Sequence, residues 1–213
     1  MDNIHVGAYG WDNESWQRNY YPEDLPKDWR LDFYANSYRV TLVPETEWLS
    51  WDNEQIEETE DAVEGAFYFY FEVLLSSLQP RSKKSVDATQ QLKKIIASLE
   101  SKMGGVVVVD DLQEDEGDIK LANSILGCDV TLVSNCRVLE GWQWEHKGLT
   151  CSGNPCGVVA SLSDDAKQQA ALMQDFESSL PKDNKGSALF IKDSRVDMNQ
   201  LSNLKTIAEI LGY

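Results

Sequence analysis

Two adjacent carboxylates follow the most apolar run of the chain. Asp110 and Asp111 come directly after the four valines of Val106–Val109. A carboxylate at the end of a buried strand can act as a general base or as a metal ligand, while its neighbour caps the following loop. Aspartate is also favoured in strand-end turns and helix caps, so a structural role is the alternative. We take Asp110 and Asp111 as the candidate catalytic residues.

A second group of charged side chains follows the apolar run Ala188–Ile191. Lys192, Asp193 and Arg195 lie within four residues of one another. The planar guanidinium of Arg195 suits a carboxylate or a phosphate, and Lys192 adds a second positive charge. The alternative is a local ion pair on the surface, which is common and weak. The three residues predict a binding site for a small anionic molecule.

Three aromatic residues near the start of the chain form the third candidate group. Tyr9, Trp11 and Trp16 lie within eight residues of one another. Ligand pockets are often lined by aromatic rings with a few polar groups, so these side chains are candidate ligand-binding residues. The alternative is that they pack a loop against the core, because tryptophan buries a large apolar area.

Metal and cofactor motifs are not found in the sequence. The chain has two histidines, His5 and His146, too few for a site with several histidine ligands. Ser152-Gly153 is not part of a nucleophile elbow, and the glycines at 7 and 10 lack the spacing of a dinucleotide loop. We therefore expect no bound metal and no cofactor.

The four cysteines match no common zinc-binding pattern. They are Cys128, Cys136, Cys151 and Cys156. Cys151 and Cys156 flank a turn sequence, so a disulfide between them is sterically conceivable. A cytosolic location argues against it, and we expect reduced thiols.

Strand-like and helical patterns alternate along the chain, which is typical of an α/β protein with a parallel sheet. Several of the strand-like runs are continuously apolar, as in strands buried on both faces. Seven strands are predicted: Ile4–Ala8, Tyr38–Val43, Phe67–Leu74, Val106–Val109, Val130–Val133, Gly157–Ala160 and Ala188–Ile191.

Four helices are predicted from apolar residues at helical spacing and from stop or cap residues. They cover 85–102 and 118–126, a segment capped by Ser163, and a last helix that begins at Asp197. The segments 45–65 and 137–155 remain as long connections, and long connections are functional or mobile. The first of them is expected to contain a solvated acidic helix.

Charge is the unusual feature of the composition. The 213-residue chain has a net charge of −17, and residues 1–65 alone carry 16 acidic and four basic residues. The segment 45–64 contains nine acids and no base. Because nucleic-acid affinity depends largely on Lys and Arg, we expect no nucleic-acid or anionic membrane partner. The acidic segment is a solvated surface, or else a surface that binds a cation or a protein partner.

The sequence was also searched for a signal peptide and for membrane-spanning segments, which bear on where the protein is located. The start of the chain has no basic region followed by an apolar one, and no apolar run approaches the roughly 18 residues of a membrane span. We therefore expect a cytoplasmic protein.

The opening segment resembles the YecE-like family, domain of unknown function 72. That family begins with Gly-x-x-Gly-Trp, then has a Trp, Tyr-Pro-x-x-Leu-Pro, Trp-Leu and Tyr-Tyr-Ala. The matching residues here are Gly7, Gly10, Trp11, Trp16, Tyr21, Pro22, Leu25, Pro26, Trp29, Tyr34 and Ala35. The end of the chain, 189–193 and Asn203, matches loosely. The resemblance implies one TIM-type β/α-barrel domain over residues 1–213, and seven strands leave its closure open.

Barrel enzymes and binding proteins use the carboxyl ends of their strands, where the following loops meet. This rule groups the candidates above with the other residues that follow predicted strands: Pro44, Glu45, Ser134, Asn135 and Ser161.

Other segments depart from the family pattern. The second strand lacks the Glu and Asn of the family's Val-Glu-Ile-Asn, its Glu-Phe-Arg and Arg-x-His-Gly strands are not found, and Lys192 and Asp193 replace an Asn pair. This pattern indicates a shortened, divergent relative with a degenerate site. We expect a non-enzymatic or small-ligand-binding protein. The alternative is an enzyme acting on a small anionic or sugar-like substrate at the barrel mouth.

Overall fold

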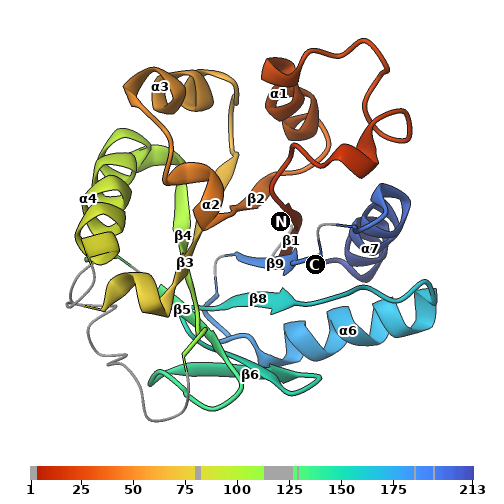
Figure 1. Cartoon of the computed structure of the whole chain (residues 1–213). Coiled ribbons are helices and arrows are strands. Elements are labelled where there is room, and N and C mark those ends of the chain that lie inside the picture. The colour runs from red at the N-terminus through yellow and green to blue at the C-terminus, as the bar shows by residue number, and fades with distance from the viewer. Residues whose placement is uncertain (1–3, 80–82, 113–126, 129, 185, 194) are drawn as a thin grey trace.

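The computed structural model describes residues 4–79, 83–112, 127–128, 130–184, 186–193 and 195–213. It is a mixed α/β structure in which one nine-stranded sheet curls into a nearly closed barrel with helices outside (Figure 1). The strand order is β6-β7-β5-β4-β3-β2-β1-β9-β8. The first and the last strand of the chain, β1 and β9, are neighbours in this sheet.

All seven predicted strands are present, and each pairs in parallel with a neighbour. Two further strands, β6 and β7, form an antiparallel hairpin that pairs with β5. The bounds are β1 Ile4–Tyr9, β2 Val40–Val43, β3 Tyr68–Leu74, β4 Met103–Val109, β5 Val130–Ser134, β6 Trp142–His146, β7 Leu149–Gly153, β8 Cys156–Val159 and β9 Ser187–Ile191.

The described helices cover the outside of the sheet. They are α1 Arg30–Ala35, α2 Glu45–Trp48, α3 Asn53–Asp61, α4 Lys83–Ser98, α6 Ala166–Ser179 and α7 Met198–Leu211, with 3-10 turns at Glu14–Trp16, Lys27–Trp29, Leu75–Leu78 and Glu100–Lys102. None of the helices in the described ranges is long and apolar enough to cross a membrane.

The predicted helices agree with the structure except at their ends. The helix predicted over 85–102 ends earlier, at Ser98, and the predicted helix 118–126 lies outside the described residues. Asp197 caps α7 as predicted. The prediction that Ser163 caps the next helix is wrong, because Asp165 accepts the Lys167 backbone N–H at 2.8 Å. Ser163 instead accepts a hydrogen bond from the Asp165 backbone.

The β6–β7 hairpin replaces the long connection expected over 137–155. Its two-residue turn, Lys147-Gly148, has positive φ at both positions, 50° and 80°. This is the type I′ geometry that matches the twist of the strands. The usual sequence signal for such a turn is Asn-Gly or Asp-Gly, and Lys-Gly lacks it, so the hairpin was not expected.

Side chains close the seam between β7 and β8. The backbone N–H of Val158 donates to Cys151 Sγ at 3.3 Å, a contact between strands that have no backbone ladder. None of the four cysteines, all of which lie in described residues, forms a disulfide. Burial raises the pKa of the Cys151 thiol to about 11, so it is a packed thiol and not a reactive thiolate.

The opening segment folds over the barrel rim. Trp16 is 1% exposed, stacks on Tyr34 and donates its indole N–H to the Val196 carbonyl at 2.9 Å. The Tyr34 hydroxyl accepts from the backbone of Ala8 and donates to the Val40 carbonyl. A Cβ atom at Gly7 would lie 2.6 Å from that same carbonyl, which is why glycine is required there.

Replacing Phe176 tests the packing of α6 on the hairpin. Phe176 is fully buried, and its ring lies 4.9 Å from that of Trp144 and 6.1 Å from that of Trp142. We expect Phe176→Ala to lower the free energy of unfolding by about 3–5 kcal/mol, measured by urea denaturation. Ile210→Ala, at a position 78% exposed on α7, is the control and should cost less than about 0.5 kcal/mol. Equal losses would contradict the packing described.

Candidate functional site

The register of the sheet brings three polar side chains to one level of the barrel interior. Side chains alternate along a strand, so Tyr70 and Glu72 of β3 point inward, while Phe71 packs outward against Trp48. Tyr9 ends β1, and Lys192 directly follows β9. The three residues Tyr9, Glu72 and Lys192 therefore meet at the carboxyl ends of their strands, the mouth of the barrel.

Glu72 is the centre of this group and is 3% exposed. Its Oε1 lies 2.5 Å from Lys192 Nζ, and its Oε2 accepts hydrogen bonds from the Tyr9 hydroxyl and the backbone N–H of Glu45. The Lys192 ammonium also lies 5.5 Å from the centre of the Tyr9 ring. Burial, with the hydrogen bond to Glu72, raises the pKa of Tyr9 well above its usual value. Tyr9 therefore stays a protonated donor.

Glu45 is a second buried carboxylate beside this group. It opens α2, and its two oxygens accept from the Leu74 backbone at 2.5 Å and the Ser77 hydroxyl at 2.6 Å. Burial raises the pKa of Glu45 despite these hydrogen bonds. These contacts fasten α2 to the end of β3, and thereby position the backbone N–H that Glu72 accepts.

A cavity of about 370 Å³ opens beside Lys192 at the mouth. Five of its nine lining residues are apolar, and the polar ones come from the ends of β4, β5 and β9. The lining residues are Val109, Asp110, Val133, Ser134, Asn135, Leu149, Val158, Ala160 and Lys192. Its volume lies near the lower end of the range for small-molecule sites.

The two candidate carboxylates hold the structure around this cavity. Asp110 forms an ion pair with Arg137 at 2.7 Å and accepts the Ser134 hydroxyl at 2.7 Å. Asp111 accepts both the backbone N–H and the hydroxyl of Ser76. Asp110 thus lines the cavity, while Asp111 connects the end of β4 to the turn after β3.

Lys192 and Arg195 do not lie together. The Lys192 side chain is turned inward to Glu72, whereas that of Arg195 is 89% exposed and lies 3.8 Å from Asp193. The Asp193 carboxylate also accepts the Arg195 backbone N–H at 2.8 Å. The geometry of Asp193 and Arg195 is that of a local surface pair, and Lys192 alone reaches the cavity.

Of the three aromatic candidates, Tyr9 alone lies at the mouth. Trp16 lies in the rim packing described above. Trp11 is 8% exposed and packs on the outer side of the sheet, with its ring 6.2 Å from those of Trp51 and Phe69. The three aromatic side chains do not form one platform.

Glu72 and Arg137 were missed by inspection of the sequence. Glu72 is a charged residue inside the apolar and aromatic run of β3, and a charge in a buried strand must be paired. That signal was available. The pairing of Arg137 with Asp110 depends on how the chain turns after β5, and no local pattern indicates it.

The acidic front third contains a separate hollow. This groove of about 620 Å³ lies between the 3-10 turn 27–29 and α3, on the outer side of the sheet. Its lining includes Trp11, Trp29, Trp51, Glu47, Glu58 and Asp61. Burial, and to a smaller degree Asp12, raises the pKa of Glu47 to about 7.

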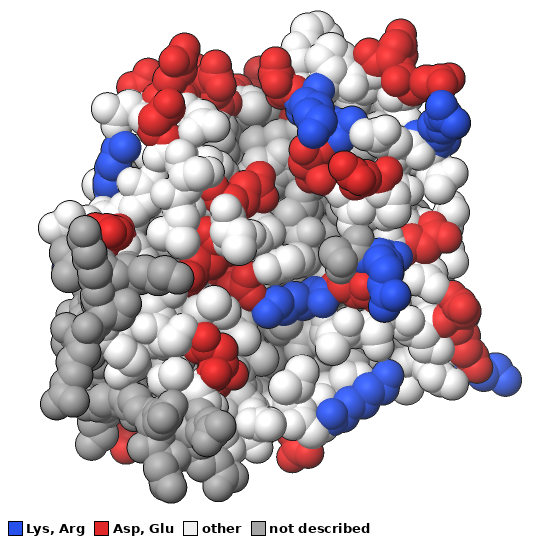
Figure 2. Space-filling model, in the orientation of Figure 1, with Lys and Arg blue, Asp and Glu red and all other residues white. Residues whose placement is uncertain are grey.

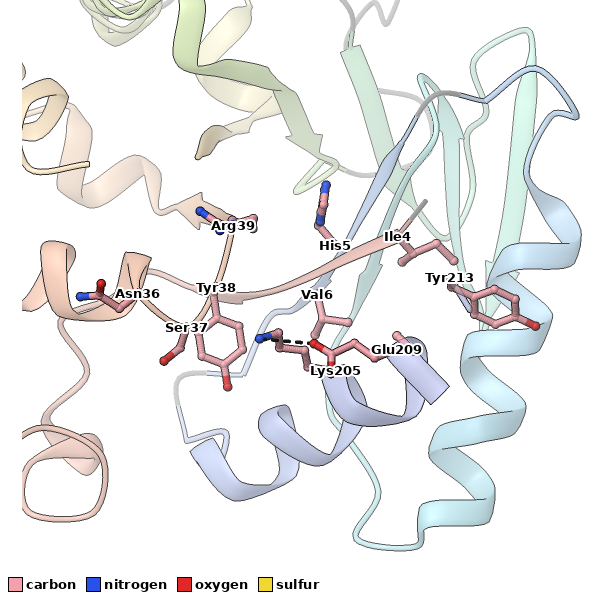
Figure 3. A pocket seen from close by; sticks show the side chains of 11 residues that line it. Ile4, His5, Val6, Asn36, Ser37, Tyr38, Arg39, Lys205, Glu209 and Tyr213 are labelled. Carbon is pink, nitrogen blue, oxygen red and sulfur yellow. Dashed lines mark ion pairs between the residues drawn. The ribbon is translucent and has the colours of Figure 1, made fainter. Parts of the chain in front are cut away.

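A third hollow lies at the opposite end of the barrel (Figure 3). It has about 200 Å³ between the start of β1 and α7. Figure 3 shows Lys205 between Tyr38 and Glu209, with which it forms an ion pair at 3.5 Å. Its position at the amino ends of the strands makes it a weaker candidate than the mouth.

No cluster of three histidine, cysteine, aspartate or glutamate residues suited to a metal ion is found among the residues that the structure describes. The side chains at the mouth are instead arranged as ion pairs, with Lys192 on Glu72 and Arg137 on Asp110. The site can offer the ammonium of Lys192 and the amide of Asn135 to a ligand.

These features define a β/α barrel with a lysine–glutamate ion pair at its mouth. Several solved structures have a similar fold. A DUF72 family protein from Thermotoga maritima matches 99% of this chain and 99% of its own, with a TM-score of 0.59 and 14% identity. Two structures of a DUF72 family protein from Enterococcus faecalis match 97% and 100% of this chain, and 95% and 99% of their own, with TM-scores of 0.61 and 11% identity.

These matches confirm, at the level of the fold, the resemblance to the YecE-like family. No protein-family model matches the chain, and no curated protein does.

Removing Lys192 tests the pair at the mouth. Lys192→Met leaves the buried Glu72 without its counter-ion, so we expect the free energy of unfolding to fall by about 2–4 kcal/mol. The double variant Lys192→Met/Glu72→Gln should lose less, because it removes the uncompensated charge. Lys167→Met, at an exposed position on α6, is the control. Denaturation curves of the four proteins decide this, and a double variant less stable than Lys192→Met would contradict the pairing.

Glu47 predicts a pH dependence of stability. Its pKa is raised from 4.5 to about 7 in the folded state, so its contribution is fully present below pH 4.5 and is lost as pH rises through 7. Between pH 5 and 8, wild type should lose up to about 3 kcal/mol relative to Glu47→Gln. Denaturation at a series of pH values measures this. The exposed Glu54→Gln should give a curve parallel to wild type, and a parallel curve for Glu47→Gln would refute the prediction.

Proposed function

We propose that this protein is a divergent, cytosolic relative of the YecE-like barrels that binds a small ligand at the mouth without transforming it. The observation that carries the proposal is the Lys192 ammonium at the edge of the mouth cavity, held in place by Glu72. Four cysteines without a disulfide support the cytosolic location. The fold itself supports no particular chemistry, because barrels host many.

The lining of the cavity indicates the ligand class. Lys192 and Asn135 offer hydrogen-bond donors, whereas the Ser134 hydroxyl donates to Asp110, and the valine, leucine and alanine side chains offer an apolar wall. A small molecule with a carboxylate or other anionic group on a short apolar body fits this lining. Lys192 is 28% exposed, so its ammonium remains accessible while it is paired with Glu72.

The carboxylates around the cavity favour binding over catalysis. Both oxygens of Glu45, Asp110 and Asp111 accept hydrogen bonds within the chain. Glu72 accepts them at Oε2, and its Oε1 is taken up by the ion pair with Lys192. A general base must accept a proton from the substrate at a free position within hydrogen-bond reach. These carboxylates instead position the ends of strands and the side chains of Lys192 and Arg137.

An enzyme acting on a small anionic or sugar-like substrate is the second candidate. The observation that favours it is the chain of contacts from Lys192 through Glu72 to Tyr9, which links two proton donors through one acceptor. In that case Lys192 would contact the substrate and Glu72 would position the Lys192 ammonium. The two candidates differ in whether a product forms.

A ligand panel with a cavity-filling variant tests the proposal. The panel contains acetate, succinate, citrate, inorganic phosphate and ribose, with calorimetry as the measurement. We expect a carboxylate to bind wild type and to bind Ala160→Leu at least about tenfold more weakly, because leucine at this lining position fills the cavity. Ala171→Leu, exposed on α6, should bind like wild type.

Two outcomes would overturn the binding proposal. The first is equal affinity of the panel for Ala160→Leu and Ala171→Leu. The second is the appearance of a chemically altered compound by NMR after incubation with wild type, which would support the enzyme instead.

A further inference from the structure

The groove in the acidic front third has the composition of a docking site. Trp11 and Trp51 form its floor, with ring centres 6.2 Å apart, and they are 8% and 7% exposed. Trp29 lines one side and is 63% exposed. A tryptophan so exposed beside a groove is unusual for a surface without a partner, because tryptophan is enriched at interfaces.

The charges of the groove are not balanced within the protein. Asp28, Glu47, Glu58 and Asp61 line it, and none of them forms an ion pair with any residue that the structure describes. The basic residue in the lining, Lys27, lies 3.7 Å from Asp12 and is thereby partly neutralised. Figure 2 shows acidic side chains gathered over α3 and the neighbouring upper part of this face.

Glu47 adds support from inside the groove. Its raised pKa reflects loss of hydration and the nearby charge of Asp12. A carboxyl group in this position gains from a cation that enters the groove, because the cation compensates for the missing water. This expectation does not depend on the proposal for the mouth cavity.

The arrangement favours an extended basic segment over a single ion. Glu58 and Asp61 are three residues apart on α3, so they share a face with a rise of about 4.5 Å between them. Asp28 belongs to the 3-10 turn on the other side of the groove and Glu47 to α2, so the carboxylates are spread over three elements and not gathered at one point. Alternate residues of an extended peptide lie about 7 Å apart on one side, which allows two cations to reach carboxylates at different places in the groove.

We infer that this groove docks a basic segment of a partner protein, with an arginine side chain stacked on Trp29 and its guanidinium held by the groove carboxylates. Arginine suits the site better than lysine, because its planar group stacks on an indole ring and binds a carboxylate with two hydrogen bonds. Its aliphatic stem covers apolar surface that Trp29 exposes. The partner expected for the acidic segment 45–64 is therefore a protein segment that contains arginine.

Fluorescence anisotropy with labelled peptides tests the inference. The probe is a nine-residue peptide with arginine at alternate positions and glycine or serine between them, and a lysine version and a glutamate version are compared with it. We expect the arginine peptide to bind more tightly than the lysine peptide and the glutamate peptide not to bind. Trp29→Ala should weaken binding roughly tenfold, because it removes the ring on which the arginine stacks.

Matched charge variants separate the groove from the general acidity of the surface. Glu58→Gln/Asp61→Asn removes two charges from the groove, whereas Glu54→Gln/Glu57→Gln removes two exposed charges from the same helix outside it. The first should weaken binding roughly tenfold and the second less than about twofold. Circular dichroism and the melting temperature verify folding of each variant.

Three results would overturn the inference. If the arginine peptide does not bind wild type, the groove is not a docking site for a basic segment. Equal weakening of binding by the two double variants would mean that the peptide is attracted by the overall negative charge of the protein and not by the groove. Displacement of the peptide by spermidine at equal or lower concentration assigns the groove to a small polyamine and not to a protein segment.

Discussion

The buried carboxylate of Glu72 is the constraint on which the arrangement of the barrel mouth depends. A charge at 3% exposure is tolerated only with partners, and its partners come from both ends of the chain: Tyr9 from β1 and Lys192 from the end of β9. The backbone of Glu45 adds a contact from α2. One side chain of β3 thus connects the ends of β1 and β9 with the start of α2.

The opening segment has a different role. Tyr34 and Trp16 hydrogen-bond to the backbone of β1, the start of β2 and the segment before α7, so this segment seals the rim between the first and last parts of the barrel. The residues that carry the family resemblance are therefore mainly structural. Two of them, Trp11 and Trp29, also line the groove in the acidic front third, whereas the mouth cavity is lined by residues outside the opening segment. A shared signature is thus compatible with a divergent function.

The helices and strands were predicted well where the apolar pattern and the cap residues lie within the element itself. The seven parallel strands are apolar enough to be recognised from composition, and Asp197 and Gly212 bound the last helix as cap residues do. Predictions were incomplete where two segments had to be combined. The hairpin has no Asn-Gly turn, and its tryptophans are buried by α6, a partner remote in sequence.

The sequence by itself determined the α/β alternation, the seven parallel strands, the acidic front third and the family resemblance, because these depend on local spacing and composition. Only the tertiary structure decided which polar groups share a site. It turned Lys192 toward Glu72 and away from Arg195, paired Asp110 with Arg137, and separated Trp11 from Tyr9. Such pairings depend on sheet register and on the direction of each side chain, and both are fixed by packing between distant segments.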